Sequence, residues 1–153
     1  GLVGDETSMH VAEDVVAASL IASGIIGVAT KTVVGRSRPF LNKGTTHFAP
    51  FTDSNSSFFS GHATQAFTTA AVIAETYDET WIDVTAYSLA SLAAVARTYH
   101  DKHFTSDILT GAIVGTLVGK SVVAHNKELR GNKLSITPAV SQGMVGIQIA
   151  GRF

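Results

Sequence analysis

Apolar and small residues dominate four long stretches of the chain, at residues 8–34, 61–77, 83–99 and 106–126. Each stretch is long enough to form a helix. Alanine, leucine and isoleucine favour helix, and the valine and threonine content does not override a pattern of this length. The hydrophobic pattern therefore predicts a mainly α fold.

Polar segments separate these predicted helices. Residues 36–60 hold two of the three prolines and many serine, threonine and asparagine residues. We expect a long ordered loop or a set of short turns there, and loops of this length in a small domain are usually functional. Residues 77–82 form a short polar link between the second and third helices.

Two of the predicted helices begin with capping signals. Ser60 comes directly before the second helix, and its hydroxyl can accept a hydrogen bond from the first turn. Thr105 or Ser106 is the corresponding candidate at the fourth helix. Asp107 then lies in the first turn of that helix, where a negative charge suits the helix dipole.

The pattern changes after Asn126. Apolar residues then recur at period two, as at Val145, Ile147 and Ile149. Residues 141–143 could turn between two such segments. This arrangement predicts a short C-terminal β-hairpin.

Composition agrees with a folded domain. The chain has 153 residues and a mass of 16.0 kDa, so we expect one domain over residues 1–153, with a helical core at about 8–126 and a tail at 127–153. Apolar residues make up 45% and charged residues 15%, against about 25% charged in an average soluble domain. These values exclude an intrinsically disordered chain. They leave either a compact helical core or a protein that lies near lipid.

The longest charge-free helical stretch, residues 15–30, bears on that choice. Its sixteen residues are short against the roughly 20 needed to cross a bilayer, and it contains serine and glycine. We therefore expect a buried core helix, with membrane insertion as the alternative.

Charge, cysteine content and the start of the chain narrow the function classes. The net charge of −1 gives no electrostatic footprint for nucleic acid. The absence of cysteine excludes disulfides, thiolate zinc sites, iron–sulfur clusters and cysteine nucleophiles. The chain begins at Gly1 without an initiator methionine or a basic start followed by an apolar run. We therefore expect a processed or truncated N-terminus and no secretory signal.

The first cluster of chemically useful residues lies at the end of the first helix. Lys31 and Arg38 are seven residues apart, so they can project to one side if the helix persists. Pro39 then ends the helix or keeps the following chain extended. The cations could bind an anion, or they could simply stabilise the negative end of the helix dipole.

The second cluster is Ser56-Ser57-Phe58-Phe59-Ser60-Gly61-His62, which leads directly into the second helix. A helix start offers unpaired N–H groups, glycine lets an anion approach the backbone, and serine adds a hydroxyl donor. His62 can exchange a proton with a bound group. The alternative is an ordinary capped helix.

The third cluster comprises Arg97, His103 and Asp107. His103 and Asp107 are four residues apart, so the carboxylate can reach the imidazole and make its free nitrogen a nucleophile or base. Arg97 supplies a bidentate donor for an oxyanion. A metal site that includes His100 and Asp101 is disfavoured, because the His-x-x-x-His spacing is absent and nearby cations would repel a metal. A polar helix junction is the other alternative.

The three clusters together support a functional site more strongly than any one of them alone. Each lies at the end of a helix that must pack against the others, and only 23 residues of the chain are charged. Lys31, Arg38 and Arg97 would then lie beside one another without neutralisation. The arrangement predicts a strongly anionic ligand, most simply a phosphoryl group.

The residues, taken in order, resemble a known signature. Lys-x6-Arg-Pro, then Ser-Gly-His, then Arg-x5-His-x3-Asp, over residues 31–107, is similar to the signature of the type 2 phosphatidic acid phosphatase (PAP2) superfamily. That superfamily includes bacterial acid phosphatases, lipid phosphate phosphatases and vanadium haloperoxidases. Two positions differ from the usual pattern, since Phe59 replaces a proline and Ala96 replaces a serine. Neither change removes a group that performs chemistry.

The resemblance implies a helical bundle with the site at the helix ends, and a role for each residue. His103 would attack phosphorus and form a phosphohistidine, and Asp107 would orient His103. His62 would protonate the leaving group and then activate water. The phosphoryl oxygens would be bound by Lys31, Arg38, Ser60, Gly61 and Arg97. No metal or other cofactor is implied.

We therefore expect a metal-independent phosphatase that acts on phosphomonoesters, with lipid phosphates and diphosphates among the candidate substrates. Alternatives are a vanadium haloperoxidase, a non-catalytic anion-binding module, and a fragment of a multi-span lipid phosphatase. We expect no nucleic-acid partner. We expect association with a membrane surface, and a location in the bacterial periplasm or on the outer-facing side of a membrane. The size of the chain disfavours the haloperoxidase, and the retained histidines disfavour the binding module.

Overall fold

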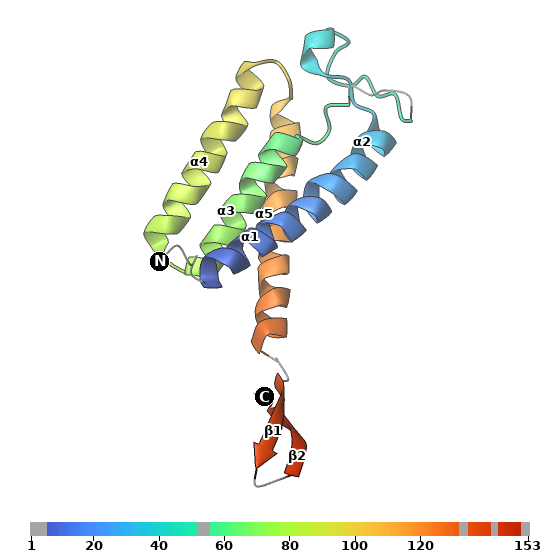
Figure 1. Ribbon diagram of the computed structural model, residues 1–153. Helices are drawn as coiled ribbons and strands as arrows, with labels where there is room; N and C mark the ends of the chain where they lie inside the picture. The colour runs from blue at the N-terminus through green and yellow to red at the C-terminus, as the bar shows by residue number, and fades with distance from the viewer. Residues whose placement is uncertain (1–5, 52–55, 132–134, 142–143, 151–153) are drawn as a thin grey trace. The chain divides into compact units, whose positions relative to one another are not determined.

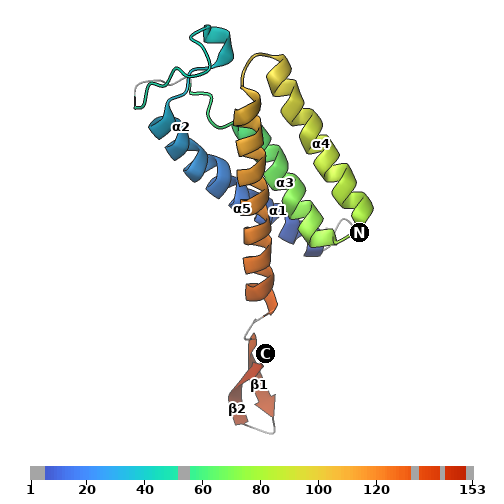
Figure 2. The same ribbon diagram turned by 180° about the vertical axis from the view of Figure 1, so that it is seen from behind.

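The computed structural model describes residues 6–51, 56–131, 135–141 and 144–150 (Figures 1 and 2). Its elements, in chain order, are α1 (Glu6–Ser19), the π-helix η1 (Leu20–Gly27), α2 (Val28–Val34), the 3₁₀ helix η2 (Pro39–Leu41), α3 (Gly61–Tyr77), α4 (Thr80–Tyr99), α5 (Thr105–Gly131), β1 (Ser135–Ser141) and β2 (Met144–Ala150). The mainly α fold predicted from the sequence is confirmed. The chain divides into two compact units, residues 1–123 and 124–153.

The first predicted helix forms but ends before the second cation of its cluster. α1, η1 and α2 follow one another without a break, and Gly35 then adopts the left-handed conformation with φ 57°. Its N–H donates to the Lys31 carbonyl oxygen at 2.9 Å, which closes the helix. The helix does not persist to Arg38, because glycine stops it after Val34, so Lys31 and Arg38 do not share a helix face.

The loop that follows is ordered and folds back onto the end of α2. Arg36 and Phe48 form an isolated antiparallel bridge, and the Ala49 N–H donates to the Gly35 carbonyl oxygen at 2.9 Å. A side chain at position 35 would collide with the backbone of Ala49. Glycine therefore serves both the turn and the close approach of the loop.

The next helix forms where predicted. α3 matches the predicted range of residues 61–77, and the Ser60 hydroxyl accepts a hydrogen bond from the Ala63 N–H at 3.4 Å. The predicted N-cap is confirmed. α4 begins at Thr80, within the expected link at residues 77–82, because the Glu79 carbonyl already accepts the first helical hydrogen bonds.

The start of α5 differs from the prediction. The helix begins at Thr105, so Thr105 and Ser106 lie inside its first turn and neither precedes it as a cap. The Asp107 carboxylate instead accepts a hydrogen bond from the Phe104 N–H at 2.9 Å. An acidic residue in the first turn commonly reaches back in this way, and here it fixes the segment just before the helix.

Three glycines set the distance between α3 and α5. Gly111, Gly115 and Gly119 are spaced by four residues and share one helix face. A Cβ at Gly111 would lie 2.7 Å from the Ser60 carbonyl oxygen, and one at Gly119 would lie 2.9 Å from the Ala71 Cβ. Small residues at this spacing let helix backbones approach closely. The Ser60 N–H consequently donates to the Asp107 carbonyl oxygen at 3.0 Å.

α3 is the helix on which the others pack. It contacts α1 and α4 and, through the glycines, α5, which lies behind α3 in Figure 1 and in front of it in Figure 2. One apolar cluster joins Ala18, Val72 and Val123. A second, which joins Ala63, Ala94 and Ile108, lies closer to the start of α3. Small side chains predominate in both, so the helices can lie near one another.

The expectation of a buried helix at residues 15–30 is wrong. Val16, Leu20 and Ile25 are 60%, 63% and 66% exposed. The helical segment Glu6–Val34 is long and apolar enough to cross a membrane, and so is α5. The charge-free stretch underestimated the first segment because the helix continues past Asp14 on one side and Lys31 on the other.

The second unit includes the predicted hairpin. β1 and β2 pair antiparallel, with Ser135 opposite Ala150 and Ser141 opposite Met144. The apolar positions that recur at period two in β2 lie opposite Ile136, Pro138 and Val140 of β1. The turn was expected at residues 141–143. Ser141 is the last residue of β1, and residues 142–143 lie outside the described residues.

Candidate active site

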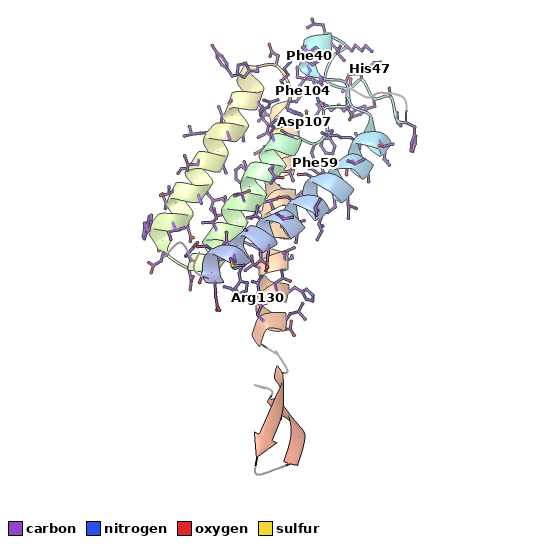
Figure 3. All side chains as sticks on the ribbon, in the orientation of Figure 1. Phe40, His47, Phe59, Phe104, Asp107 and Arg130 are labelled. Carbon is purple, nitrogen blue, oxygen red and sulfur yellow. The ribbon has the colours of Figure 1, made fainter. Side chains whose placement is uncertain are left out.

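The site residues predicted from the sequence come from separate elements. Lys31 lies in the last turn of α2, and Arg38 lies just before η2. Ser60, Gly61 and His62 lie at the start of α3, and Arg97 lies in the last turn of α4. His103 lies two residues before α5, and Asp107 lies in the first turn of that helix. Figure 3 shows Asp107 and Phe104 at the end of the helices that also carries the loop with Phe40 and His47.

Lys31 reaches the start of α3. A Cβ placed on Gly61 would lie 3.6 Å from the Lys31 Nζ, so the ammonium group lies directly beside the first residue of the helix. The first N–H groups of a helix have no helical acceptor, and Ser60 already caps the N–H of Ala63. The positive end of α3 and the Lys31 charge therefore act on the same volume.

The charges around His62 link the three sequence clusters. Partial burial of the ring lowers the pKa of His62 below its ordinary value, and electrostatic interactions with neighbouring groups lower it further. Those groups, in decreasing order of effect, are Arg97, His103, Lys31 and Arg38. The structure thus brings all three clusters within electrostatic range of one exposed imidazole.

Three cations at the site lack a carboxylate partner. Within residues 6–51 and 56–131, no ion pair involves Lys31, Arg38 or Arg97. The Nε atoms of both arginines are buried, and the described residues offer them no hydrogen-bond acceptor. Buried polar groups are normally hydrogen-bonded, so these arginines are suited to an anionic ligand between them.

His103 is buried and held by the main chain. Its Nδ1 lies 2.9 Å from the Ser57 carbonyl oxygen and 3.9 Å from the Asp107 Oδ2. A carbonyl oxygen can only accept, so this contact requires a proton on Nδ1, and in the neutral ring the lone pair is then on Nε2. The structure thus brings Asp107 within ion-pair range, but the hydrogen bond that fixes the ring goes to Ser57.

Asp107 is fully buried and has partners that the sequence did not indicate. Arg36 Nη1 lies 2.7 Å from its Oδ1, and Oδ2 accepts from the Phe104 N–H. A buried carboxylate needs a cation or several donors. That requirement could have singled out Arg36, the cation of Gly35-Arg36-Ser37-Arg38 to which the pattern gave no role. Ser57 had no signal, because it contributes a main-chain oxygen.

Phe59, which departs from the usual pattern, has a packing role. It is 2% exposed, and its ring lies 3.8 Å from the position of a Cβ on Gly27. The Phe58 and Phe59 rings meet edge to face with centroids 6.1 Å apart. The segment that leads into α3 is therefore anchored by aromatic packing against η1, where other sequences of this pattern use a proline.

The residues considered for an alternative metal site do not form one. Over the part of the chain that the structure describes, no three histidine, aspartate or glutamate side chains gather as a metal-binding group. His103 and Asp107 are instead occupied by Ser57, Phe104 and Arg36.

Comparison with known proteins agrees with the predicted resemblance. Residues 9–130 match the sequence model of the PAP2 superfamily. Over 66 residues the chain is 38% identical to a lipid A 1-phosphatase of Porphyromonas gingivalis. The aligned segment covers 42% of this chain and 15% of that protein. No solved structure matches the chain significantly. Both matches support a phosphatase. Because the family model matches 122 consecutive residues, the chain belongs to the PAP2 superfamily.

Proposed function

We propose that the protein is a metal-independent phosphatase that hydrolyses phosphate monoesters through a phosphohistidine. The observation that carries the proposal is the set of cations Lys31, Arg38 and Arg97. They have no carboxylate partner among the described residues, and they act on the start of α3 and on His62. The buried His103, with Nδ1 held by a carbonyl oxygen, presents Nε2 as the nucleophile.

The first step transfers the phosphoryl group to His103. Nε2 attacks phosphorus, and a bond from nitrogen to phosphorus forms as the bond to the ester oxygen breaks. The leaving oxygen takes a proton from His62, whose ring is exposed and can reach a substrate at the mouth of the site. The alcohol then departs and leaves phosphohistidine.

The second step returns the enzyme to its starting state. His62, now neutral, removes a proton from a water molecule that attacks phosphorus. The bond between phosphorus and Nε2 breaks, and inorganic phosphate leaves. Lys31, Arg38 and Arg97, together with the Ser60 hydroxyl and the Gly61 N–H, hold the three equatorial oxygens as charge shifts between them.

The three cations could hold these oxygens without a metal ion. In many phosphoryl-transfer enzymes, magnesium neutralises charge that builds on the transferring group. Here two buried arginine Nε atoms, for which the described part of the chain offers no acceptor, and an ammonium group beside Gly61 are available for that task. Guanidinium groups bind phosphoryl oxygens in pairs, which also fixes the orientation of the substrate.

We further propose a lipid phosphate substrate. The two long apolar helices and the relative named as a lipid A phosphatase suggest membrane association. α4 adds an outward apolar face with Trp81 and Tyr99 near its ends, 68% and 86% exposed. Aromatic residues at both ends of a segment about 30 Å long are typical of membrane interfaces. We place the site on the periplasmic side of a bacterial membrane.

Phosphate release tests the proposal. The protein in detergent micelles is supplied with a lipid phosphate, a soluble aryl phosphate and a nucleotide, each in the presence of EDTA. We expect phosphate release under EDTA, inhibition by vanadate, and preference for the lipid. Loss of activity in EDTA with recovery on magnesium or zinc would contradict the metal-independent mechanism. Preference for the nucleotide would contradict the lipid assignment.

A further inference from the structure

We propose that Arg36 is a positioning residue that fixes the nucleophile His103 through two separate connections, while Arg38, two residues away, binds substrate. The inference rests on the proposed function, because it assumes that His103 is the nucleophile. It concerns a residue that the resemblance gave no role.

The first connection runs through the side chain. Arg36 Nη1 donates to Asp107 Oδ1 and to the Ser106 hydroxyl, both at 2.7 Å. Its Nε and Nη2 donate to the Thr45 carbonyl oxygen at 3.1 and 2.9 Å, and the guanidinium lies 4.2 Å from the centre of the Phe104 ring. All three nitrogens are occupied by the protein. Arg36 is therefore poorly placed to bind a phosphoryl oxygen.

The second connection runs through the main chain. The Arg36 carbonyl oxygen accepts from the Ser57 N–H at 2.7 Å, and the Ser57 carbonyl oxygen accepts from His103 Nδ1. Ser57 is fully buried, and its hydroxyl donates to the Ser37 carbonyl oxygen at 3.3 Å. The group that holds the imidazole is thus itself held by the backbone of Arg36.

The two connections meet at His103 from different directions. Through Ser57, Arg36 fixes which ring nitrogen carries the proton and where the ring lies. Through Asp107 and Phe104, it fixes the segment that leads from His103 into α5 (Figure 3). Only the side-chain connection depends on the guanidinium, because its fork contacts Thr45 and Asp107 at once. Loss of the Arg36 guanidinium should misplace the Nε2 atom of His103 and leave the phosphate-binding residues in place.

A pair of matched substitutions tests the assignment. Arg36→Lys and Arg38→Lys each keep the charge and lie in the same short segment. We expect Arg36→Lys to lower kcat on the order of 100-fold, the effect of displacing a reactive atom by about 1 Å, with the inhibition constant for inorganic phosphate almost unchanged. We expect Arg38→Lys to weaken phosphate binding about tenfold. Equal weakening of phosphate binding by the two substitutions would overturn the inference.

A milder variant keeps the test decisive if Arg36→Lys does not fold. Ser106→Ala removes one acceptor of Arg36 on an exposed residue and leaves every charge in place. We expect kcat to fall a few-fold, at unchanged phosphate affinity and melting temperature.

A double variant gives a further test. The double variant Arg36→Lys with Asp107→Asn should lose no more kcat than the more damaging single substitution. Additive losses, or an unchanged kcat in Ser106→Ala, would overturn the inference.

The experiment separates this inference from the proposed function. Turnover by the unsubstituted protein is measured first. Absence of turnover with every ester would count against the proposed function. Turnover by that protein, with kcat unchanged in Arg36→Lys, would count against the role of Arg36 alone.

Discussion

Arg36 and Arg38 lie two residues apart, and the structure uses them in opposite ways. Arg36 donates to Thr45, Ser106 and Asp107. Arg38 makes no ion pair with any described residue, and its buried Nε has no acceptor there. One side of the site is therefore anchored by protein groups, and the other is left open to an anion.

The difference teaches how a chain with few charges separates positioning from binding. A cation whose donors are all occupied holds other protein groups in place. A cation whose donors are partly buried and vacant can receive a ligand without breaking contacts. Proximity in sequence does not decide which role a residue has. The loop folds back onto Arg36 and supplies Thr45 as its partner, whereas Arg38 lies at the start of η2.

The largest effect should come from the anchored side. His103→Ala removes the proposed nucleophile, and we expect turnover to fall by about 10,000-fold or more. His100→Ala, three residues earlier on an exposed position, serves as the control and should leave turnover within about twofold. Steady-state hydrolysis of an aryl phosphate measures both. Substantial activity in His103→Ala would remove the nucleophile from the account.

The open side should contribute less per residue. Arg97→Ala removes one donor to the transferring oxygens, and we expect kcat/KM to fall about 100- to 1,000-fold, or ~3 kcal/mol of transition-state stabilisation. Lys102→Ala is a nearby control, because that ammonium lies 4.9 Å from the Phe40 ring centre and contacts no described carboxylate. Similar losses in the two variants would show that activity depends on overall positive charge and on no specific phosphate-binding role of Arg97.

The smallest effect is a titration shift at His62. Burial and the positive groups around it hold the pKa of His62 below that of an ordinary histidine. Bound inorganic phosphate adds negative charge, which favours the protonated ring, so the pKa of His62 should rise on binding. Proton NMR of the histidine rings can follow this, with the exposed His125 as an unshifted reference. A fall in the pKa of His62 on phosphate binding would place the anion elsewhere.

Sequence patterns predicted the helices better than the contacts among the candidate site residues. The range of α3 and the Ser60 cap follow from local rules of helix formation. The pairing of Arg36 with Asp107, and of Ser57 with His103, joins residues 71 and 46 positions apart. Such contacts depend on how the loop folds back, which side-chain periodicity does not encode.

The first helix shows a second limit. The length of a charge-free stretch does not measure a membrane-spanning segment, because Asp14 is buried and lies inside the longer apolar helix. Gly111, Gly115 and Gly119 recur every four residues in the sequence, but the spacing alone does not name the helix that packs against them. It fixes α5 against α3 and so brings Asp107 to Ser60.

The most direct test of the central claim uses His62→Ala and two substrates, with EDTA present. A nitrophenolate leaves without a proton and an alkoxide does not, so the account predicts severe loss with an alkyl phosphate and a rapid first step with nitrophenyl phosphate. Because the second step still needs His62, phosphohistidine should accumulate on His103, seen as a burst of nitrophenol followed by slow release. Similar small losses with both esters, without a burst, would contradict the mechanism.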